Sequence, residues 1–167
     1  TGVQTCALPI FLGIANRWSL AYAIAQAFHR EGARLILTYQ GERLKETVEE
    51  LGASLGAARV FDCDVSKDEE ITKLAAAMNE EERLDIVVHS IAFASAEDLS
   101  RPFTETSRDG YLMAQNISAY SMVAVARACA PKMTNGGAMM TLTYLGASRD
   151  RKSTRLNSSH ITISYAV

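Results

Sequence analysis

The sequence is poor in the residues that stabilise disulfide-linked and metal-bound domains. It has three cysteines, Cys6, Cys63 and Cys129, which lie far apart and form no CxxC pair. An odd number of separated cysteines favours a reducing compartment with buried thiols over disulfides or a zinc site. The three histidines show no metal-ligand spacing either. We therefore expect no metal and a cytoplasmic location.

The sequence also lacks an excess of charge of either sign and any long apolar run. Its 17 basic and 19 acidic side chains leave a net charge of -2, which gives no electrostatic reason to bind nucleic acid or an anionic membrane. No apolar run reaches the roughly 18–20 residues that a membrane-spanning helix needs. The apolar segment 7–15 is short and has no basic leader, which is not typical of a secretory signal. We expect neither nucleic acid nor membrane as a partner.

What the sequence does contain is an alternation of two hydrophobic periods between residue 10 and about residue 145. Short apolar runs typical of buried parallel strands occur at 10–14, 34–39, 59–65, 84–91 and 138–143. Apolar residues recur at helical spacing in segments that end at Gly32 and at Gly52, around 71–78, and over a long stretch at 106–133. This alternation predicts an α/β fold, a Rossmann-type doubly wound parallel sheet with right-handed crossovers.

The two ends of the chain depart from this alternation. Residues 151–167 follow neither period, and Pro9 falls where a central strand would lose a ladder hydrogen bond. Both ends resemble translated vector or adaptor sequence, with divergent natural termini as the alternative. We expect a non-native leader at 1–10, the amino-terminal part of a dinucleotide-binding Rossmann domain at 11–150, and a non-native tail at 151–167.

The turn between the first strand and the first helix has features of a phosphate-binding turn. A dinucleotide pyrophosphate needs exposed backbone N–H groups at a helix start and a residue without a side chain where the strand ends. Gly13 and Ala15 supply small residues, and Ser19 can either cap the helix or donate to a phosphate. The G-x-G-x-x-G pattern is absent, so the spacing leaves both roles of Ser19 open.

Polar residues follow the second and third strands. Gln40 stands where such folds face the adenosine ribose; its amide suits NAD, whereas the 2′-phosphate of NADP calls for a basic residue. Arg43, three residues later, keeps NADP as the alternative cofactor, and a solvated turn residue is the alternative role for Gln40. Asp64 could accept from an adenine amino group or cap the next helix, with Ser66 as a competing cap.

Small residues and a tyrosine follow the fourth and fifth strands. The small residues within 90–94 would let a cofactor approach the backbone. Tyr144 stands at the carboxyl end of the fifth strand, where a phenol can polarise a carbonyl or donate a proton to a ligand. A partly buried tyrosine with a backbone partner is the alternative. His29 and His89 are predicted to be packed or solvated and not catalytic.

Together, these segments resemble bacterial enoyl-acyl-carrier-protein reductases of the short-chain dehydrogenase superfamily. They are, in order, Gly13-Ile-Ala-Asn with Ser19-Leu-Ala, Thr38-Tyr-Gln40, Cys63-Asp-Val65, His89-Ser-Ile-Ala-Phe-Ala94, Asn116-Ile-Ser with Tyr120-Ser, and Leu142-Thr-Tyr144-Leu-Gly146. The resemblance covers about residues 11–149. It implies NADH-dependent reduction of the trans-2 double bond of an acyl group on acyl carrier protein, in fatty-acid synthesis, by a homotetramer.

The resemblance also implies roles for individual residues. It suggests cofactor contacts for Gly13, Ser19, Leu20, Gln40, Asp64, Val65 and Ile91, a substrate contact for Ala94, and an active-site role for Tyr144. The family's second tyrosine and its lysine would fall near Thr154 and Ile161. We therefore expect an incomplete sheet of about five of the family's seven strands, and no activity of this chain by itself. Another short-chain reductase and a non-catalytic NAD-binding protein are the alternatives.

Overall fold

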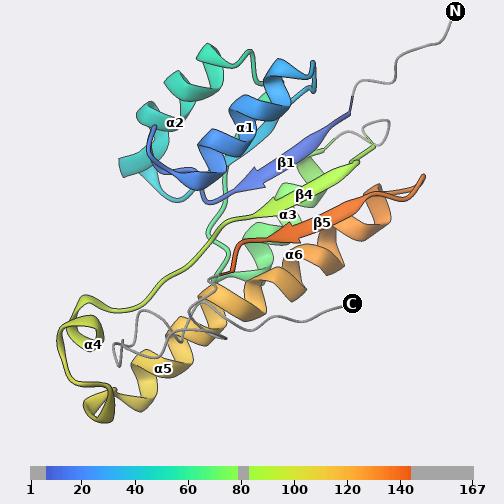
Figure 1. Ribbon diagram of the computed structural model, residues 1–167. Helices are drawn as coiled ribbons and strands as arrows, with labels where there is room; N and C mark the ends of the chain where they lie inside the picture. The colour runs from blue at the N-terminus through green and yellow to red at the C-terminus, as the bar shows by residue number, and fades with distance from the viewer. Residues whose placement is uncertain (1–6, 79–82, 144–167) are drawn as a thin grey trace, which may run out of the picture.

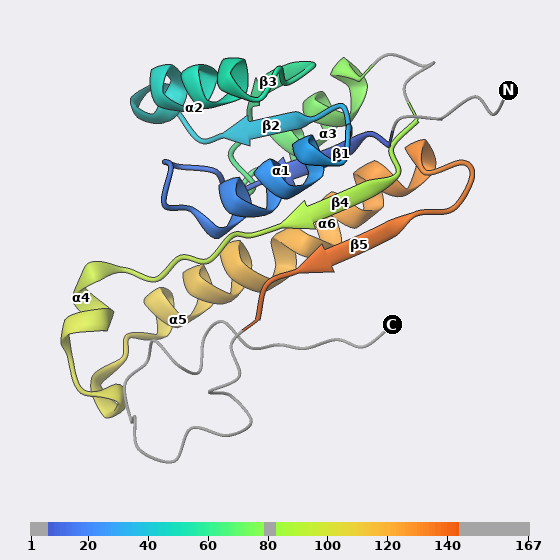
Figure 2. The same ribbon diagram turned by 45° about the horizontal axis from the view of Figure 1, so that its top comes forward.

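The computed structural model describes residues 7–78 and 83–143, which form a sheet of five parallel strands. The strands are β1 (Pro9–Leu12), β2 (Ile36–Tyr39), β3 (Arg59–Asp62), β4 (Ile86–His89) and β5 (Ala138–Thr141). Their order across the sheet is β3-β2-β1-β4-β5, so β1 lies at the centre (Figure 2). This is the arrangement of a Rossmann-type doubly wound sheet, and the fold class predicted from the sequence is confirmed.

Helices cover both faces of the sheet (Figure 1). On one face lie α1 (Leu20–Arg30) and α2 (Glu42–Ser54), and on the other lie α3 (Asp68–Ala77) and α6 (Ser121–Cys129). Helices α4 (Ala96–Ser100) and α5 (Arg108–Gln115) extend past the carboxyl end of β4 (Figure 2). Three short helices complete the described chain: η1 (Phe103–Glu105), the π-helical η2 (Asn116–Tyr120) and η3 (Ala130–Lys132).

The core divides into two layers because successive residues of a strand point to opposite faces of the sheet. In β1, Ile10 and Leu12 pack with α3 and α6, while Phe11 packs with α1 and α2. The rings of Phe11 and Phe28 meet edge to face at 5.7 Å between centroids. Since both faces are covered, the central strands carry apolar residues at most positions, which explains the nearly continuous apolar runs of the sequence.

Pro9 does not exclude its segment from the central strand, contrary to the expectation from the sequence. It is the first residue of β1 and pairs with Ile86 of β4. Proline has no N–H to donate to the ladder, and it is tolerated at the first position of a strand, where the ladder begins. Next to it, the Leu8 N–H donates to Asp85 Oδ2 at 2.9 Å. The predicted leader at 1–10 stays a prediction, and the predicted tail at 151–167 lies outside the described residues.

One prediction about a helix end is wrong. Gly52 does not stop the second helix, because α2 continues to Ser54. A Cβ at Gly52 would come within 2.8 Å of Val60 Cγ2, so the glycine serves the close packing of α2 on β3. The long helical stretch predicted at 106–133 is confirmed: α5, η2, α6 and η3 follow one another without a break over 108–132, with a π-helical turn at η2. Helix α4 was not predicted.

Candidate functional site

A pocket lies at the carboxyl ends of the strands, where β1 has β2 on one side and β4 on the other. Ligands of open α/β sheets bind at this point, because the connections leave β1 and β4 toward opposite faces. The pocket has a volume of about 310 Å³. Of the site residues predicted from the sequence, it brings together Gly13, Gln40, Asp64, Val65 and Ile91.

Gly13 sets how closely two edges of the pocket approach. Its φ of +101° lies in the region that favours glycine. A Cβ at this position would collide with the Ser90 carbonyl oxygen and come within 3.1 Å of Ile91 Cγ1. The turn after β1 therefore lies directly against the turn after β4, and only a glycine permits this backbone approach.

Ser19 makes a contact that its spacing in the sequence did not indicate, and its predicted contact with a phosphate stays a prediction. It occupies the N-cap position of α1, but its side chain makes no capping hydrogen bond. Instead, Ser19 Oγ accepts from the N–H groups of Ala15 at 3.0 Å and Asn16 at 3.1 Å, and so holds the turn together. Leu20 begins α1 and is 66% exposed. Both residues stand at the amino end of α1, whose partial positive charge attracts anions, and neither lines the pocket itself.

At the β2–β3 side of the pocket, hydrogen bonds hold the Asp64 carboxylate in its ionised, accepting form. Asp64 Oδ1 accepts from the N–H of Ser66 at 3.0 Å and from its hydroxyl at 2.7 Å, and Lys67 Nζ lies 3.4 Å from Asp64 Oδ2. Partial burial would raise the pKa of Asp64, but hydrogen bonds from Ser66, Gln40 and Lys67 outweigh it and lower the pKa below its usual value. Lys67, and neither Asp64 nor Ser66, is the N-cap of α3, so the helix-cap alternative for Asp64 is wrong.

At the β4 side, the pocket is lined by the segment that follows β4 and by one turn of the long helix. Residues 90–93 contribute from the loop, and Met113 and Ile117 contribute from α5 and η2. Ser118 Oγ accepts from the Phe93 N–H at 3.0 Å and donates to the Phe93 carbonyl at 3.2 Å. The Asn116-Ile-Ser segment is part of the family resemblance, but the sequence assigns no role to Met113, Ile117 or Ser118. A serine in the middle of a helical pattern is the signal that could have found them.

His89 lies beneath this side of the pocket, as the last residue of β4. It is fully buried, and its Nε2 lies 2.7 Å from Ser121 Oγ. Burial lowers the pKa of His89 to about 4. The imidazole is therefore neutral and packed, as predicted, and supplies no positive charge to the pocket.

The remaining predicted residues either do not line the pocket or lie outside the described residues. Ala94 follows Phe93 and is half-buried, but it is not among the lining residues. Tyr144 lies outside the described residues, as do Thr154 and Ile161. Within 7–78 and 83–143, no three His, Cys, Asp or Glu side chains come together as a metal site. None of the helices in these ranges is long and apolar enough to cross a membrane.

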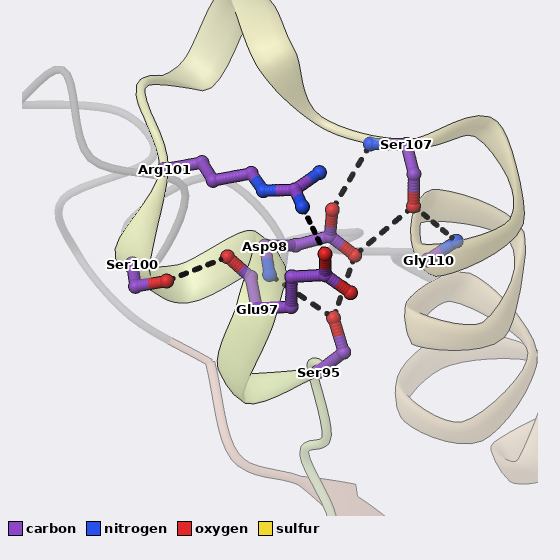
Figure 3. Close-up of polar contacts among 7 residues, drawn as sticks. All are labelled: Ser95, Glu97, Asp98, Ser100, Arg101, Ser107 and Gly110. Atoms are coloured by element: carbon purple, nitrogen blue, oxygen red, sulfur yellow. Dashed lines mark hydrogen bonds and ion pairs between the residues drawn. The ribbon is translucent and has the colours of Figure 1, made fainter.

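A polar cluster outside the pocket lining holds the segment between β4 and α5 in place (Figure 3). Asp98 of α4 is 4% exposed and accepts from Ser95 Oγ at 2.6 Å and from the N–H and Oγ of Ser107 at 3.0 and 3.2 Å. Ser95 and Ser107 are the N-caps of α4 and α5. Hydrogen bonds from these serines hold the pKa of Asp98 below its usual range. One carboxylate thus joins two helix starts and fixes where α5 returns toward the sheet.

Comparison with known proteins agrees with this architecture. A family model described as enoyl-(acyl carrier protein) reductase matches residues 13–157. The enoyl-(acyl-carrier-protein) reductase (NADH) of Bacillus cereus is 48% identical over 143 residues, which are 84% of this chain and 56% of that protein. The chain spans about half the length of the curated relatives it matches.

Two solved structures of such reductases resemble the fold closely. The enzyme of Anaplasma phagocytophilum in complex with NAD has a TM-score of 0.81 and 38% identity, over 86% of this chain and 55% of that one. The enzyme of Bacillus cereus with NADP+ and indole naphthyridinone has a TM-score of 0.85 and 44% identity, over 93% of this chain and 61% of that one.

Proposed function

The chain belongs to the enoyl-(acyl carrier protein) reductase family, and from this premise we propose that it is the dinucleotide-binding part of an NADH-dependent enoyl reductase. The proposed substrate is a trans-2-enoyl thioester of acyl carrier protein, reduced in fatty-acid synthesis by a cytoplasmic homotetramer. The observation that carries the proposal is the pocket at the switch point of the sheet, where Gly13, Gln40 and Asp64 meet.

The residues of the pocket fit a dinucleotide. At Gly13 the missing Cβ lets the turn after β1 lie directly against the Ser90 backbone, and the amino end of α1 offers N–H groups and a partial positive charge near Ser19 and Leu20. These groups suit a pyrophosphate. When bound, the reduced nicotinamide would supply the hydride for the double bond.

The β2–β3 side fits the adenosine half. We propose that Gln40 donates to ribose hydroxyls and that Asp64 accepts from the adenine amino group, with Val65 as an apolar contact. The hydrogen bonds that lower the pKa of Asp64 keep it ionised, and so accepting, at neutral pH. On the opposite side, Ile91 would lie along the nicotinamide half and Ala94 would contact the acyl thioester.

The tip of β2 favours NADH over NADPH as the cofactor. Asp62 Oδ1 accepts from the Gly41 N–H at 2.8 Å, which places a carboxylate beside the position proposed for the ribose. A 2′-phosphate there would meet like charge, which disfavours it. Arg43 is exposed at the start of α2 and is the residue that could offset this repulsion.

Tyr144 is proposed to stand beside the thioester carbonyl. A phenol in that position can donate a hydrogen bond to the carbonyl oxygen, where negative charge develops during reduction. Because this carbonyl belongs to the substrate, Tyr144 would act after the dinucleotide is in place. Cofactor binding is therefore the step that tests the proposed function most directly.

Thermal denaturation with and without NADH provides the test. A ligand that binds only the folded state at a hundred times its Kd stabilises the fold by about 2.7 kcal/mol, which corresponds to roughly 5–10 °C for a chain of this size. We expect a shift in this range with NADH and a smaller one with NADPH at equal concentration. A folded, monodisperse sample whose melting temperature responds to neither dinucleotide would refute the proposal.

A further inference from the structure

The helix that passes beside the pocket contains a single π-helical turn, η2. The Ser121 N–H donates to the carbonyl of Asn116, so this turn is wider than the α-helical turns around it. Three side chains of this region meet the carboxyl end of β4: Ile117 lines the pocket, Ser118 contacts Phe93, and Ser121 contacts His89. Single π-turns inside α-helices are frequent at functional sites, and this one adjoins the pocket.

The register between the helix and β4 is fixed below the pocket by a buried network. Ser121 Oγ donates to the carbonyl of Ile117 at 2.6 Å, so it must accept from Nε2 of His89 at 2.7 Å. Both His89 and Ser121 are fully buried. This network holds the turn in place without help from Ser118, whose hydroxyl is therefore left to act on the loop alone.

Ser118 closes a ring of two hydrogen bonds with one peptide of that loop. Its Oγ accepts from the Phe93 N–H at 3.0 Å and donates to the Phe93 carbonyl at 3.2 Å. Phe93 lies beyond His89, the last ladder position of β4, so pairing between strands does not hold its peptide. Phe93 lines the pocket and its side chain is 44% exposed. The position of the pocket wall at Phe93 thus depends on a residue that does not line the pocket.

The pocket has two sides of different origin. Gln40, Asp64 and Val65 follow β2 and β3, whereas residues 90–93 follow β4. A dinucleotide spans both halves of such a sheet, with one mononucleotide on each side of the switch point. If the adenosine half occupies the β2–β3 side, the wall held by Ser118 faces the nicotinamide half.

We propose that Ser118 is a positioning residue, which holds the Phe93 peptide so that the β4 side of the pocket accepts the nicotinamide half of the dinucleotide. This role rests on the proposed function of the chain. Since the hydroxyl does not reach the β2–β3 side, its loss should change affinity for the nicotinamide half and leave affinity for the adenosine half unchanged.

Calorimetric titration of the 167-residue chain with two probes, NADH and ADP-ribose, separates the two halves. ADP-ribose carries the adenosine and pyrophosphate groups but no nicotinamide. We expect Ser118→Ala to raise the Kd of NADH roughly three- to tenfold, the range for a lost hydrogen bond, and to change the Kd of ADP-ribose less than about twofold. Ser118→Thr, which keeps a hydroxyl, should restore NADH affinity.

Ser100→Ala is the matched control. The Ser100 hydroxyl is exposed and donates to the Glu97 carbonyl within α4, and neither residue lines the pocket (Figure 3). This variant should bind both probes as the wild type does. If Ser118→Ala changed the Kd of both probes equally, or changed neither Kd, the role of Ser118 would be wrong, while the proposed function of the chain would stand. A wild-type chain that binds neither probe would refute the proposed function, and the role of Ser118 with it.

Discussion

Lowering the pH from about 7 to about 5 should destabilise the fold through His89. In the folded chain this imidazole is fully buried between Ser121 Oγ, at 2.7 Å from Nε2, and Thr141 Oγ1, at 3.4 Å from Nδ1. Burial lowers its pKa from 6.5 to about 4. Between these values the unfolded chain binds the proton and the folded chain does not, so stability is present above pH 6.5 and is lost as the pH falls toward 4.

The magnitude follows from the difference between the two pKa values. At about 1.4 kcal/mol per pKa unit, the fold loses about 2 kcal/mol by pH 5 and about 3 kcal/mol at pH values below the folded-state pKa. Urea denaturation at a series of pH values measures this loss. His89→Gln keeps an N–H donor for Ser121 but cannot titrate. The free energy of unfolding of this variant should therefore change less with pH between pH 7 and pH 5 than that of the wild type.

His29→Gln is the matched control for this experiment. His29 is exposed on α1, outside the hydrogen-bond network of His89, Ser121 and Thr141. The control should therefore keep the wild-type dependence of unfolding free energy on pH. If His89→Gln and the wild type lost the same free energy between pH 7 and pH 5, the assignment of this dependence to His89 would be wrong.

Three further outcomes follow from the structure and the sequence. Gly13→Ala should cost about 1–3 kcal/mol more than Gly32→Ala in urea denaturation, because both glycines have positive φ but only a Cβ at Gly13 meets backbone; equal losses would contradict the close approach to Ser90. Asp98→Asn should lower the melting temperature in differential scanning fluorimetry, because the serines donate to both carboxylate oxygens and an amide replaces one of these with an NH2 donor; an unchanged melting temperature would refute the role of the cluster. The purified chain should bind NADH but not oxidise it with a crotonyl thioester, because Thr154 and Ile161 stand where the tyrosine and lysine are expected; turnover above background would show that another pair acts.

The layers of the fold could be predicted from the sequence because a strand that is buried on both faces consists of consecutive apolar residues. Residues 10–12 and 86–88 are apolar at each position, as a covered central strand requires. The ends of elements could not be predicted in the same way. Pro9 lies one position before the predicted strand, and only the pairing with Ile86 shows that it occupies the first ladder position. Gly52 resembles a helix stop in the sequence, and its role becomes visible only when Val60 is placed against it.

In the candidate site too, residues could be predicted where their place in the sequence sufficed, and could not be where their role depends on a contact with a distant segment. Gly13, Gln40 and Asp64 could be selected because each lies at the carboxyl end of a predicted strand, and parallel strands bring these ends to one edge of the sheet. Ser118 could not be selected in this way. Its partner Phe93 is 25 residues away in the sequence, and the contact depends on a π-turn that no hydrophobic period indicates.

The position of β5 predicts that cofactor binding and catalysis are separable in the proposed reductase. The pocket is lined by residues between Gly13 and Ile117, so β5 contributes none of its lining. Among the described strands, β5 pairs only with β4, and beyond the ladder the Leu142 N–H donates to the His89 carbonyl at 3.2 Å. Tyr144 follows this strand in the sequence. Residues after β5 can therefore determine the chemistry, while the groups proposed to bind the dinucleotide are held by β1 to β4 and their helices.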